Sequence, residues 1–408
     1  MAKNILIITS NYTGLGHKSI TESLTEQFSS CRDVRVHIAD GFELGGNIGL
    51  KIGKAYGSVT RNARDLYKLI WDISTKNPSI IRDFTQISIH DSFLKLLEET
   101  RPDVVVVVHP SFLSAILNIF SNYGIDIPVV AIVADLVSIS PLWADARAEY
   151  TICPTDEAKQ KCKEFGVPES RIAVTGFPVR AKFCMAAELP SVRAYYRPGR
   201  MLECLIMSGG EGSGNLGRLA RLLLQNFNCR VKIVAGRNLL LKKRLERTLL
   251  EKYPDRAEIF GFTENIQDLM LSSDLAFTRG SPNVMMEAVM CNVPLIITGA
   301  LPGQEEGNPE YAEKYDLGVV CNDLRKLKST VDDLLADNAV KLNRLRESQI
   351  RYRKSHAARD IANIILNINK NAGADFSAIA KKIKPRDLTG TLLLKKGRKS
   401  VAKNRLQK

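Results

Sequence analysis

The sequence predicts an α/β protein made of two Rossmann-like domains, each with a parallel sheet. Its 408 residues exceed what one compact domain usually holds and suit two domains of ordinary size. Short segments rich in Ile and Val alternate with longer segments of helical period, as they do in βαβ units. This alternation stops near Gly176-Phe177-Pro178 and starts again after Gly199, so the boundary between the domains is expected there.

Each predicted element follows from local apolar patterning. Six strands are expected in the first half, at residues 4–9, 34–39, 103–108, 129–134, 150–153 and 171–175. Helices are expected between them, most clearly at 18–29, 80–99 and 156–165. The second half repeats the pattern, with strands at 202–207, 230–235, 258–260, 275–278, 294–297 and 318–320. A long helix at 329–354 and an amphipathic segment at 357–368 complete it.

These elements divide the chain into a first domain at residues 1–177, a linker at 178–200 and a second domain at 201–355. A candidate return helix at 356–370 and a tail at 371–408 follow. Ligands of parallel sheets bind at the carboxyl ends of the strands. A cleft between two facing sheets is therefore the expected site.

Charge and composition limit the class of protein. The 45% hydrophobic and 25% charged composition excludes a disordered or fibrous chain. The chain shows no secretory signal and no apolar run of the about 20 residues that span a bilayer. Eight scattered cysteines indicate thiols in a reducing compartment, so a cytoplasmic location is expected.

The net charge of +14 is concentrated at the C-terminus. Residues 370–408 carry +10, which leaves about +4 for the rest, an ordinary value for two domains. This basic tail is either solvated or an electrostatic tether to anionic lipid headgroups. Because it lacks interleaved aromatic residues and any known module, nucleic acid is not an expected partner.

Two glycine-rich turns follow predicted strands and open predicted helices. Such turns let the backbone approach a ligand, and the helix N–H groups favour a phosphate. Neither turn ends in the GK[ST] of a Walker loop, and the second lacks the acidic residue of a dinucleotide site. The candidate residues are Gly14 and Gly16 in the first turn, and Gly209, Gly210, Gly212 and Ser213 in the second.

Two polar side chains at the ends of first-half elements are candidate proton acceptors. His17 begins the first helix, and its usual pKa near 6.5 suits a general base. Asp135 closes an apolar strand, so its carboxylate is expected at the same edge of the sheet. Solvation or helix capping is the alternative interpretation of both residues.

The order of motifs between residues 261 and 311 is specific. It contains Gly261-Phe262-Thr263, then Thr278-Arg279-Gly280-Ser281-Pro282-Asn283 with Glu287, and then Pro302-Gly303-Gln304-Glu305 with Asn308. This order resembles the donor half of the diacylglycerol glycosyltransferases, the monogalactosyldiacylglycerol synthases and processive diacylglycerol glucosyltransferases of GT-B architecture. Segments 5–17, 134–143 and 174–179 are similar to the other half of that family. Ala134, Ser140 and the loop 279–283 depart from its pattern.

The resemblance implies roles for these residues. The second domain would bind a UDP-sugar and the first an acceptor. Glu287 would bind the ribose hydroxyls, and the backbone around Phe262 and Ile266 would hold uracil. The sugar would contact Gln304, Glu305 and Asn308. The second glycine-rich turn and Arg279, Ser281, Pro282 and Asn283 would neutralise the diphosphate. Because the chain has no Asp-x-Asp, neither a metal nor another cofactor is expected.

For catalysis we expect His17 to act as the base with Asp135 in support. Asp135 would itself be the base if burial raised its pKa, and would otherwise orient and polarise His17.

A long insert at residues 45–100 mixes Ile, Leu, Tyr and Trp with Lys and Arg. It is either core with a solvated basic face, or a helix lying on lipid headgroups. The resemblance places the membrane-binding and acceptor-admitting segment here. The expected acceptor and membrane residues are Gly14, Gly16, Tyr56, Tyr67, Trp71 and Trp143.

The expected function is transfer of glucose or galactose from UDP-glucose or UDP-galactose to diacylglycerol, with inversion and in one or several rounds. The enzyme would be peripheral on the inner face of the cell membrane, at an anionic surface, and its oligomeric state stays open. The alternatives are transfer of N-acetylglucosamine to a polyprenyl-linked acceptor, UDP-sugar epimerisation, and an inactive nucleotide- or lipid-binding module.

Overall fold

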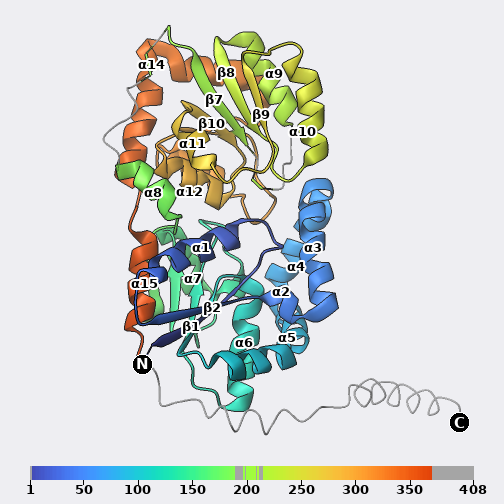
Figure 1. Cartoon of the computed structure of the whole chain (residues 1–408), viewed down its shortest axis with the longest axis vertical. Coiled ribbons are helices and arrows are strands. Elements are labelled where there is room, and N and C mark those ends of the chain that lie inside the picture. Colours follow the sequence, from blue (N-terminus) through green and yellow to red (C-terminus); the bar gives the residue numbers. More distant parts are fainter. Residues whose placement is uncertain (1, 189–195, 198, 208, 211–214, 370–408) are drawn as a thin grey trace, which may run out of the picture.

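The computed structural model contains two six-stranded parallel sheets, one in each half of the chain (Figure 1). It describes residues 2–188, 196–197, 199–207, 209–210 and 215–369. We call the half around the first sheet the N-terminal half and the half around the second sheet the C-terminal half. The predicted fold class of two facing parallel-sheet domains is therefore confirmed.

The N-terminal sheet has the strand order β2-β1-β3-β4-β5-β6. Its strands are β1 (Lys3–Thr9), β2 (Val34–Asp40), β3 (Val104–Val107), β4 (Val129–Ile132), β5 (Tyr150–Cys153) and β6 (Ile172–Val174). Its helices are α1 (Gly16–Ser29), α2 (Gly41–Leu44), α3 (Gly46–Asn62), α4 (Arg64–Lys76), α5 (Pro78–Thr100), α6 (Pro110–Tyr123) and α7 (Asp156–Glu164). The β3 sequence is four consecutive valines, all buried, as expected for a strand covered on both faces.

The C-terminal sheet has the order β12-β11-β10-β7-β8-β9, which is the order of the Rossmann fold. Its strands are β7 (Leu202–Met207), β8 (Cys229–Val234), β9 (Ala257–Phe260), β10 (Leu275–Thr278), β11 (Leu295–Ile297) and β12 (Gly318–Val320). The helices after β6 are α8 (Ala181–Glu188), α9 (Leu216–Asn226), α10 (Leu239–Leu245), α11 (Ile266–Leu271), α12 (Pro282–Met290), α13 (Asn308–Lys314), α14 (Leu327–Tyr352) and α15 (Ala357–Asn367).

The expected long helix at 329–354 is interrupted. Within α14 the backbone of residues 336–339 is non-helical, and Asp337, Asn338 and Ala339 have positive φ. Apolar periodicity continues on both sides of this kink, because Val331, Leu334, Leu342 and Leu345 are all buried in the C-terminal core. Periodicity alone therefore cannot locate the break.

The chain returns to the N-terminal half at its end, as expected from the amphipathic segment. Helix α15 lies beside α1 (Figure 1), and Ile361 and Ile365 join the core that contains Ile5 and Ile7. Lys3 Nζ donates to the carbonyl oxygen of Leu366 at 2.7 Å. At the crossing, Gly176 has φ +97° and leaves no room for a Cβ beside Lys354. This return ties the two halves together at a second place besides the linker.

Between β2 and β3 the predicted insert forms α3, α4 and α5, which lie on one side of the N-terminal half (Figure 1). Its outer surface carries many exposed apolar side chains: Ile48, Ile52, Leu66, Leu69, Ile70, Ile73, Ile80, Phe84 and Ile87. In the described part of the chain, no helix combines the length and the apolar character needed to cross a bilayer.

Candidate active site between the two sheets

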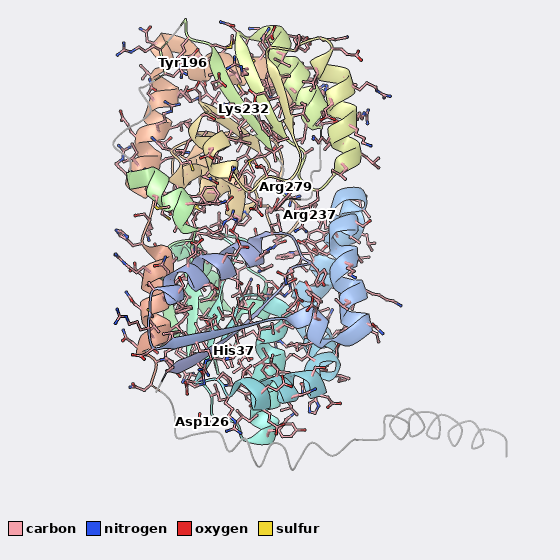
Figure 2. The ribbon with its side chains drawn as sticks, viewed as in Figure 1. His37, Asp126, Tyr196, Lys232, Arg237 and Arg279 are labelled. Atoms are coloured by element: carbon pink, nitrogen blue, oxygen red, sulfur yellow. The ribbon has the colours of Figure 1, made fainter. Side chains whose placement is uncertain are left out.

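A cleft of about 930 Å³ lies between the carboxyl ends of the two sheets. In the N-terminal half it is lined by residues that follow β1 and β4, and in the C-terminal half by those that follow β7, β8, β9 and β10. Figure 2 shows Arg237 and Arg279 at this junction. The two glycine-rich turns meet here, because Leu15 packs on Gly210 and leaves no room for a Cβ there.

The glycine positions fit a close backbone approach. Gly14 and Gly209 have φ of +88° and +80°, a conformation that favours glycine. No other atom lies near the Cβ position of Gly14 or Gly16, so the first turn is open. Together with Gly210 these residues line the cleft. Gly212 and Ser213 lie outside the described residues.

His17 lines the cleft but does not keep its usual pKa. Its Nδ1 lies 2.5 Å from the carbonyl oxygen of Val108, which holds the proton on Nδ1 and leaves Nε2 as an acceptor. Burial lowers the pKa of His17 to about 4. This pKa lies below the usual value near 6.5 that made His17 a candidate base, because burial disfavours the charged imidazolium.

A second histidine was missed by the sequence reasoning. His109 follows β3, is buried, and lies with its ring 4.6 Å from the ring of His17. Burial and the neighbouring His17 lower the pKa of His109 well below its usual value. The sequence did contain a signal for His109, because a histidine directly after a run of valines is expected at the carboxyl end of a buried strand.

Asp135 is buried, and each of its two oxygens accepts one hydrogen bond, but neither bond comes from His17. Its Oδ2 accepts from Nε1 of Trp143 at 2.8 Å, and its Oδ1 accepts from Nε2 of Gln304 at 2.9 Å. Burial raises the pKa of Asp135 to about 6. The expectation that Asp135 directly orients His17 is wrong, because the carbonyl of Val108 does so.

Trp143 does not face a membrane or the open cleft. It is fully buried, with its ring 6.4 Å from that of His17 and its N–H on Asp135. Its assignment as a membrane residue is therefore corrected: it holds the Asp135 carboxylate from within the protein.

Glu287 lies on α12, where it is buried beside the cleft. Its Oε1 accepts from Asn283 Nδ2 at 3.0 Å, from Ser19 Oγ at 3.3 Å and from Arg180 Nη2 at 3.0 Å. Burial raises the pKa of Glu287, while the Arg180 charge opposes this. A carboxylate on this cleft can accept two hydroxyl hydrogen bonds, as a ribose would require.

Arg180 and Lys182 also line the cleft and were not singled out from the sequence. Arg180 bridges Glu287 and Glu22, which belong to different halves. Lys182 donates to the carbonyl of Glu264. The sequence did contain a signal for them, since Arg180 and Lys182 lie in the basic stretch that follows Gly176-Phe177-Pro178.

The loop after β10 places further polar groups at the cleft. Ser281 is the N-cap of α12 and Pro282 its first residue, so the helix N-terminus opens toward the ligand space. Arg279 Nε lies 3.3 Å from Oε1 of Glu305. The arrangement suits an anion, with Arg279 partly balanced by its carboxylate neighbour.

Of the three residues expected to contact the sugar, two line the cleft and one does not. Gln304 and Glu305 line the cleft, and Glu305 accepts from the Leu301 N–H at 2.8 Å. Asn308 does not line it: the residue is fully buried and donates to the carbonyl of Gly280 at 2.7 Å. Asn308 therefore shapes the loop after β10, and its expected contact with the sugar is corrected.

Phe262 and Ile266, which were expected beside uracil, both line the cleft. Phe262 is 52% exposed, and the guanidinium of Arg237 lies 5.5 Å from its ring centre. Ile266 is buried. An exposed aromatic ring with a cation beside it can stack on a nucleobase.

Three aromatic residues of the insert, Tyr56, Tyr67 and Trp71, point inward. Tyr67 is buried, with its hydroxyl donating to Gln304, and Tyr56 packs edge-on against it. Trp71 packs directly on Gly303, where no Cβ would fit. These three residues face the C-terminal half rather than a membrane, which corrects that part of the expectation. Among the described residues no group of three or more His, Cys, Asp or Glu is arranged to hold a metal ion.

Comparison with solved structures identifies the class of the fold. The MurG of Acinetobacter baumannii is 13% identical with a TM-score of 0.58, over 90% of this chain and all of that one. The glycotransferase of kitacinnamycin is 14% identical with a TM-score of 0.60, over 90% and 99%. A UDP-GlcNAc 2-epimerase from Neisseria meningitidis, bound to UDP-GlcNAc, is 14% identical with a TM-score of 0.57, over 89% and 100%. The chain has the GT-B fold, which transferases and epimerases share.

Sequence comparison shows similarity to one kind of glycosyltransferase. Residues 17–179 match the model of the monogalactosyldiacylglycerol (MGDG) synthase family. A processive diacylglycerol beta-glucosyltransferase of Bacillus cereus (strain ATCC 10987 / NRS 248) is 28% identical over 379 residues, 90% of this chain and 95% of that relative. One from Bacillus pumilus (strain SAFR-032) is 25% identical over 365 residues, 88% and 93%. The resemblance to the diacylglycerol glycosyltransferases is therefore confirmed across both halves.

Proposed function

We propose that this protein transfers a hexosyl group from a UDP-sugar to the hydroxyl of diacylglycerol. The observation that carries the proposal is the match to diacylglycerol glycosyltransferases over nine-tenths of the chain. The cleft adds the required chemistry: a carboxylate for ribose, a helix N-terminus for the diphosphate and a buried carboxylate for the acceptor proton.

Glucose is the proposed donor sugar. The relatives that align over both halves are named glucosyltransferases. The galactosyl family model matches residues 17–179 only. That segment ends before Glu287, Gln304 and Glu305, the residues expected to bind the donor. Its name therefore carries less weight for the sugar than the names of the full-length relatives.

The reaction is a single displacement with inversion. The acceptor oxygen attacks the anomeric carbon, the bond to the diphosphate breaks, and UDP leaves with the electron pair. Asp135 takes the hydroxyl proton, since burial has brought its pKa to about 6, nearer to neutrality than that of His17. His17 stays neutral and offers Nε2 as a hydrogen-bond acceptor. The N-terminus of α12 and Arg279 stabilise the departing charge, and no metal is proposed.

The membrane provides the acceptor. The exposed apolar side chains of α3, α4 and α5 form a surface that can enter the boundary between headgroups and acyl chains. We place the enzyme in the cytoplasm, on the inner face of the cell membrane, with the basic tail attracted to anionic lipid.

Labelled UDP-glucose mixed with diacylglycerol vesicles tests the proposal. Lipid-extractable label is expected, more with UDP-glucose than with UDP-galactose. The control Asp135→Asn should lower turnover by about 10²–10⁴-fold while UDP still binds. A changed free sugar would indicate an epimerase instead. UDP binding without turnover on diacylglycerol or polyprenyl-linked acceptors would indicate an inactive binding module.

A further inference from the structure

We propose that Tyr67 is a positioning residue that acts through Gln304: its hydroxyl fixes the side-chain amide so that the amide nitrogen donates to Asp135. The inference rests on the proposed function of the cleft, because it concerns the carboxylate assigned there to proton transfer. It gives the buried face of the insert a part in the reaction in addition to packing.

The contacts form a chain across the two halves. Tyr67 on α4 donates its hydroxyl to Oε1 of Gln304 at 2.6 Å. Tyr56 on α3 reaches the same oxygen at 3.4 Å. On the other side of the amide, Nε2 donates to Oδ1 of Asp135 at 2.9 Å. Tyr67 and Asp135 are both buried, so water does not replace these partners freely.

The chemistry of the groups decides the orientation of the amide. Burial raises the pKa of Tyr67 well above its usual value, so its hydroxyl stays a donor throughout the neutral range. A hydroxyl donor requires an oxygen, which turns Nε2 of Gln304 toward Asp135. Without the Tyr67 hydroxyl only the longer contact from Tyr56 holds the amide oxygen, so the amide can shift and its donated bond to Asp135 weakens.

The orientation affects the charge of Asp135. Burial raises the pKa of this carboxyl to about 6, and the N–H groups of Gln304 and Trp143 oppose that increase. The charge of Glu305, in the loop between β11 and α13, adds to it. From the insert, the hydroxyls of Tyr56 and Tyr67 stay neutral, since the pKa of each is raised. Loss of the Gln304 donor should therefore raise the pKa of Asp135 further.

Neighbouring contacts hold the loop that carries Gln304 against α4. Trp71 packs on Gly303, and Lys68 Nζ lies 3.9 Å from Oε1 of Glu306. Tyr67 and Asp135 belong to the N-terminal half, whereas Gln304 belongs to the C-terminal half. The donated bond therefore exists only where the two halves meet as they do here.

The test measures the pKa of Asp135 directly. Protein labelled with ¹³C at the aspartate carboxyls is titrated by NMR, and Asp135→Asn identifies the resonance. Tyr67→Phe and Gln304→Leu should each raise this pKa by about 0.5–1 unit, the effect of one lost hydrogen bond. The combined variant should shift it no further than Gln304→Leu alone. Tyr123→Phe, which removes a hydroxyl bonded to His90 outside the cleft lining, should leave it unchanged.

The acid limb of kcat/KM should move upward by the same amount, because activity requires ionised Asp135. An unshifted Asp135 resonance in Tyr67→Phe, with a thermal midpoint that shows a folded protein, would overturn the proposal. So would a Tyr67→Phe effect that persists in full in the Gln304→Leu background. A shifted resonance in a protein that transfers no sugar would support the positioning role and contradict the proposed function.

Discussion

Glu287 is the residue expected to bind the ribose of the nucleotide, and its contact with Arg180 must be considered in a test of that role. Replacement by Ala removes an acceptor for the ribose hydroxyls and also leaves Arg180 without one of its two carboxylates. We expect UDP affinity to fall by about 1.5–3 kcal/mol, roughly 10–150-fold, the range for hydrogen bonds to a charged group. Isothermal calorimetry with UDP measures it.

Glu157→Ala is the matched control for this change. Glu157 also bridges the halves, through Lys314 at 2.6 Å, but it does not line the cleft. UDP affinity in the control should stay close to that of the unchanged protein. If Glu287→Ala binds UDP equally well, Glu287 is not part of the nucleotide site.

At the residue scale, the sequence predicted which side chains line the cleft better than it predicted their burial and protonation. The lining of the cleft includes His17, Asp135 and Glu287, which the motif order had singled out. Their protonation could not be predicted, because the pKa of His17 and that of Asp135 depend on burial created by distant segments. The same limit explains Asn308: a motif residue can hold a loop instead of a ligand.

At the scale of elements, the positions of the strands could be predicted, but the break in a helix and the face that a helix buries could not. Every predicted strand is present, because parallel strands buried on both faces leave clear runs of Val and Ile. The break in α14 leaves no comparable signal. In α4 the aromatic residues Tyr67 and Trp71 lie four apart on one face, which packs inward, while Leu66, Leu69, Ile70 and Ile73 remain exposed. Composition could not tell which of the two faces packs inward and which stays exposed.

The exposed face of α4 yields a prediction. Leu69 and Ile73 lie one turn apart and are 54% and 41% exposed. The double variant Leu69→Ser, Ile73→Ser should weaken binding to neutral vesicles by about 10–30-fold, because each half-exposed side chain contributes about 1 kcal/mol when it enters the lipid. UDP affinity should not change, since neither residue lines the cleft. Cosedimentation with phosphatidylcholine vesicles measures the first effect and calorimetry the second.

A comparable pair on α14 provides the control. Val340 and Ile350 are 63% and 47% exposed on a helix at the opposite side of the molecule from α4 (Figure 1). Val340→Ser with Ile350→Ser should bind vesicles as the unchanged protein does. An equal loss of vesicle binding in both double variants would mean that binding depends on general surface hydrophobicity. The exposed face of α4 would then not be a specific lipid-binding surface.

At the scale of the whole molecule, the fold and the family answer different questions. Both a transferase and an epimerase align with the chain at TM-scores near 0.57, so architecture alone does not choose between them. The sequence relatives, aligned over both halves, favour transfer. The exposed apolar surface of the insert is consistent with a lipid acceptor, which an enzyme acting on a free nucleotide sugar does not need.

The basic tail is expected to attract the whole protein electrostatically to anionic membranes. Deleting residues from Asn371 onward removes eleven Lys and Arg and two Asp, a charge of +9 of the total +14. The hydrophobic cores of the described chain are complete by Ile368, so thermal stability should barely change. Binding to anionic vesicles should fall strongly, since each basic residue near such a surface contributes about 1 kcal/mol.

Salt and lipid charge separate the tail from the insert. On neutral vesicles the truncated and full-length proteins should bind alike, because only the apolar surface of the insert acts there. High salt should reduce the binding of the full-length protein to anionic vesicles toward that of the truncated form, because headgroup attraction is screened beyond about 8 Å at physiological ionic strength. Cosedimentation of both forms at low and high salt measures this. Equal binding to anionic vesicles at low salt would show that the tail is only solvated, and membrane attachment would then depend on the insert alone.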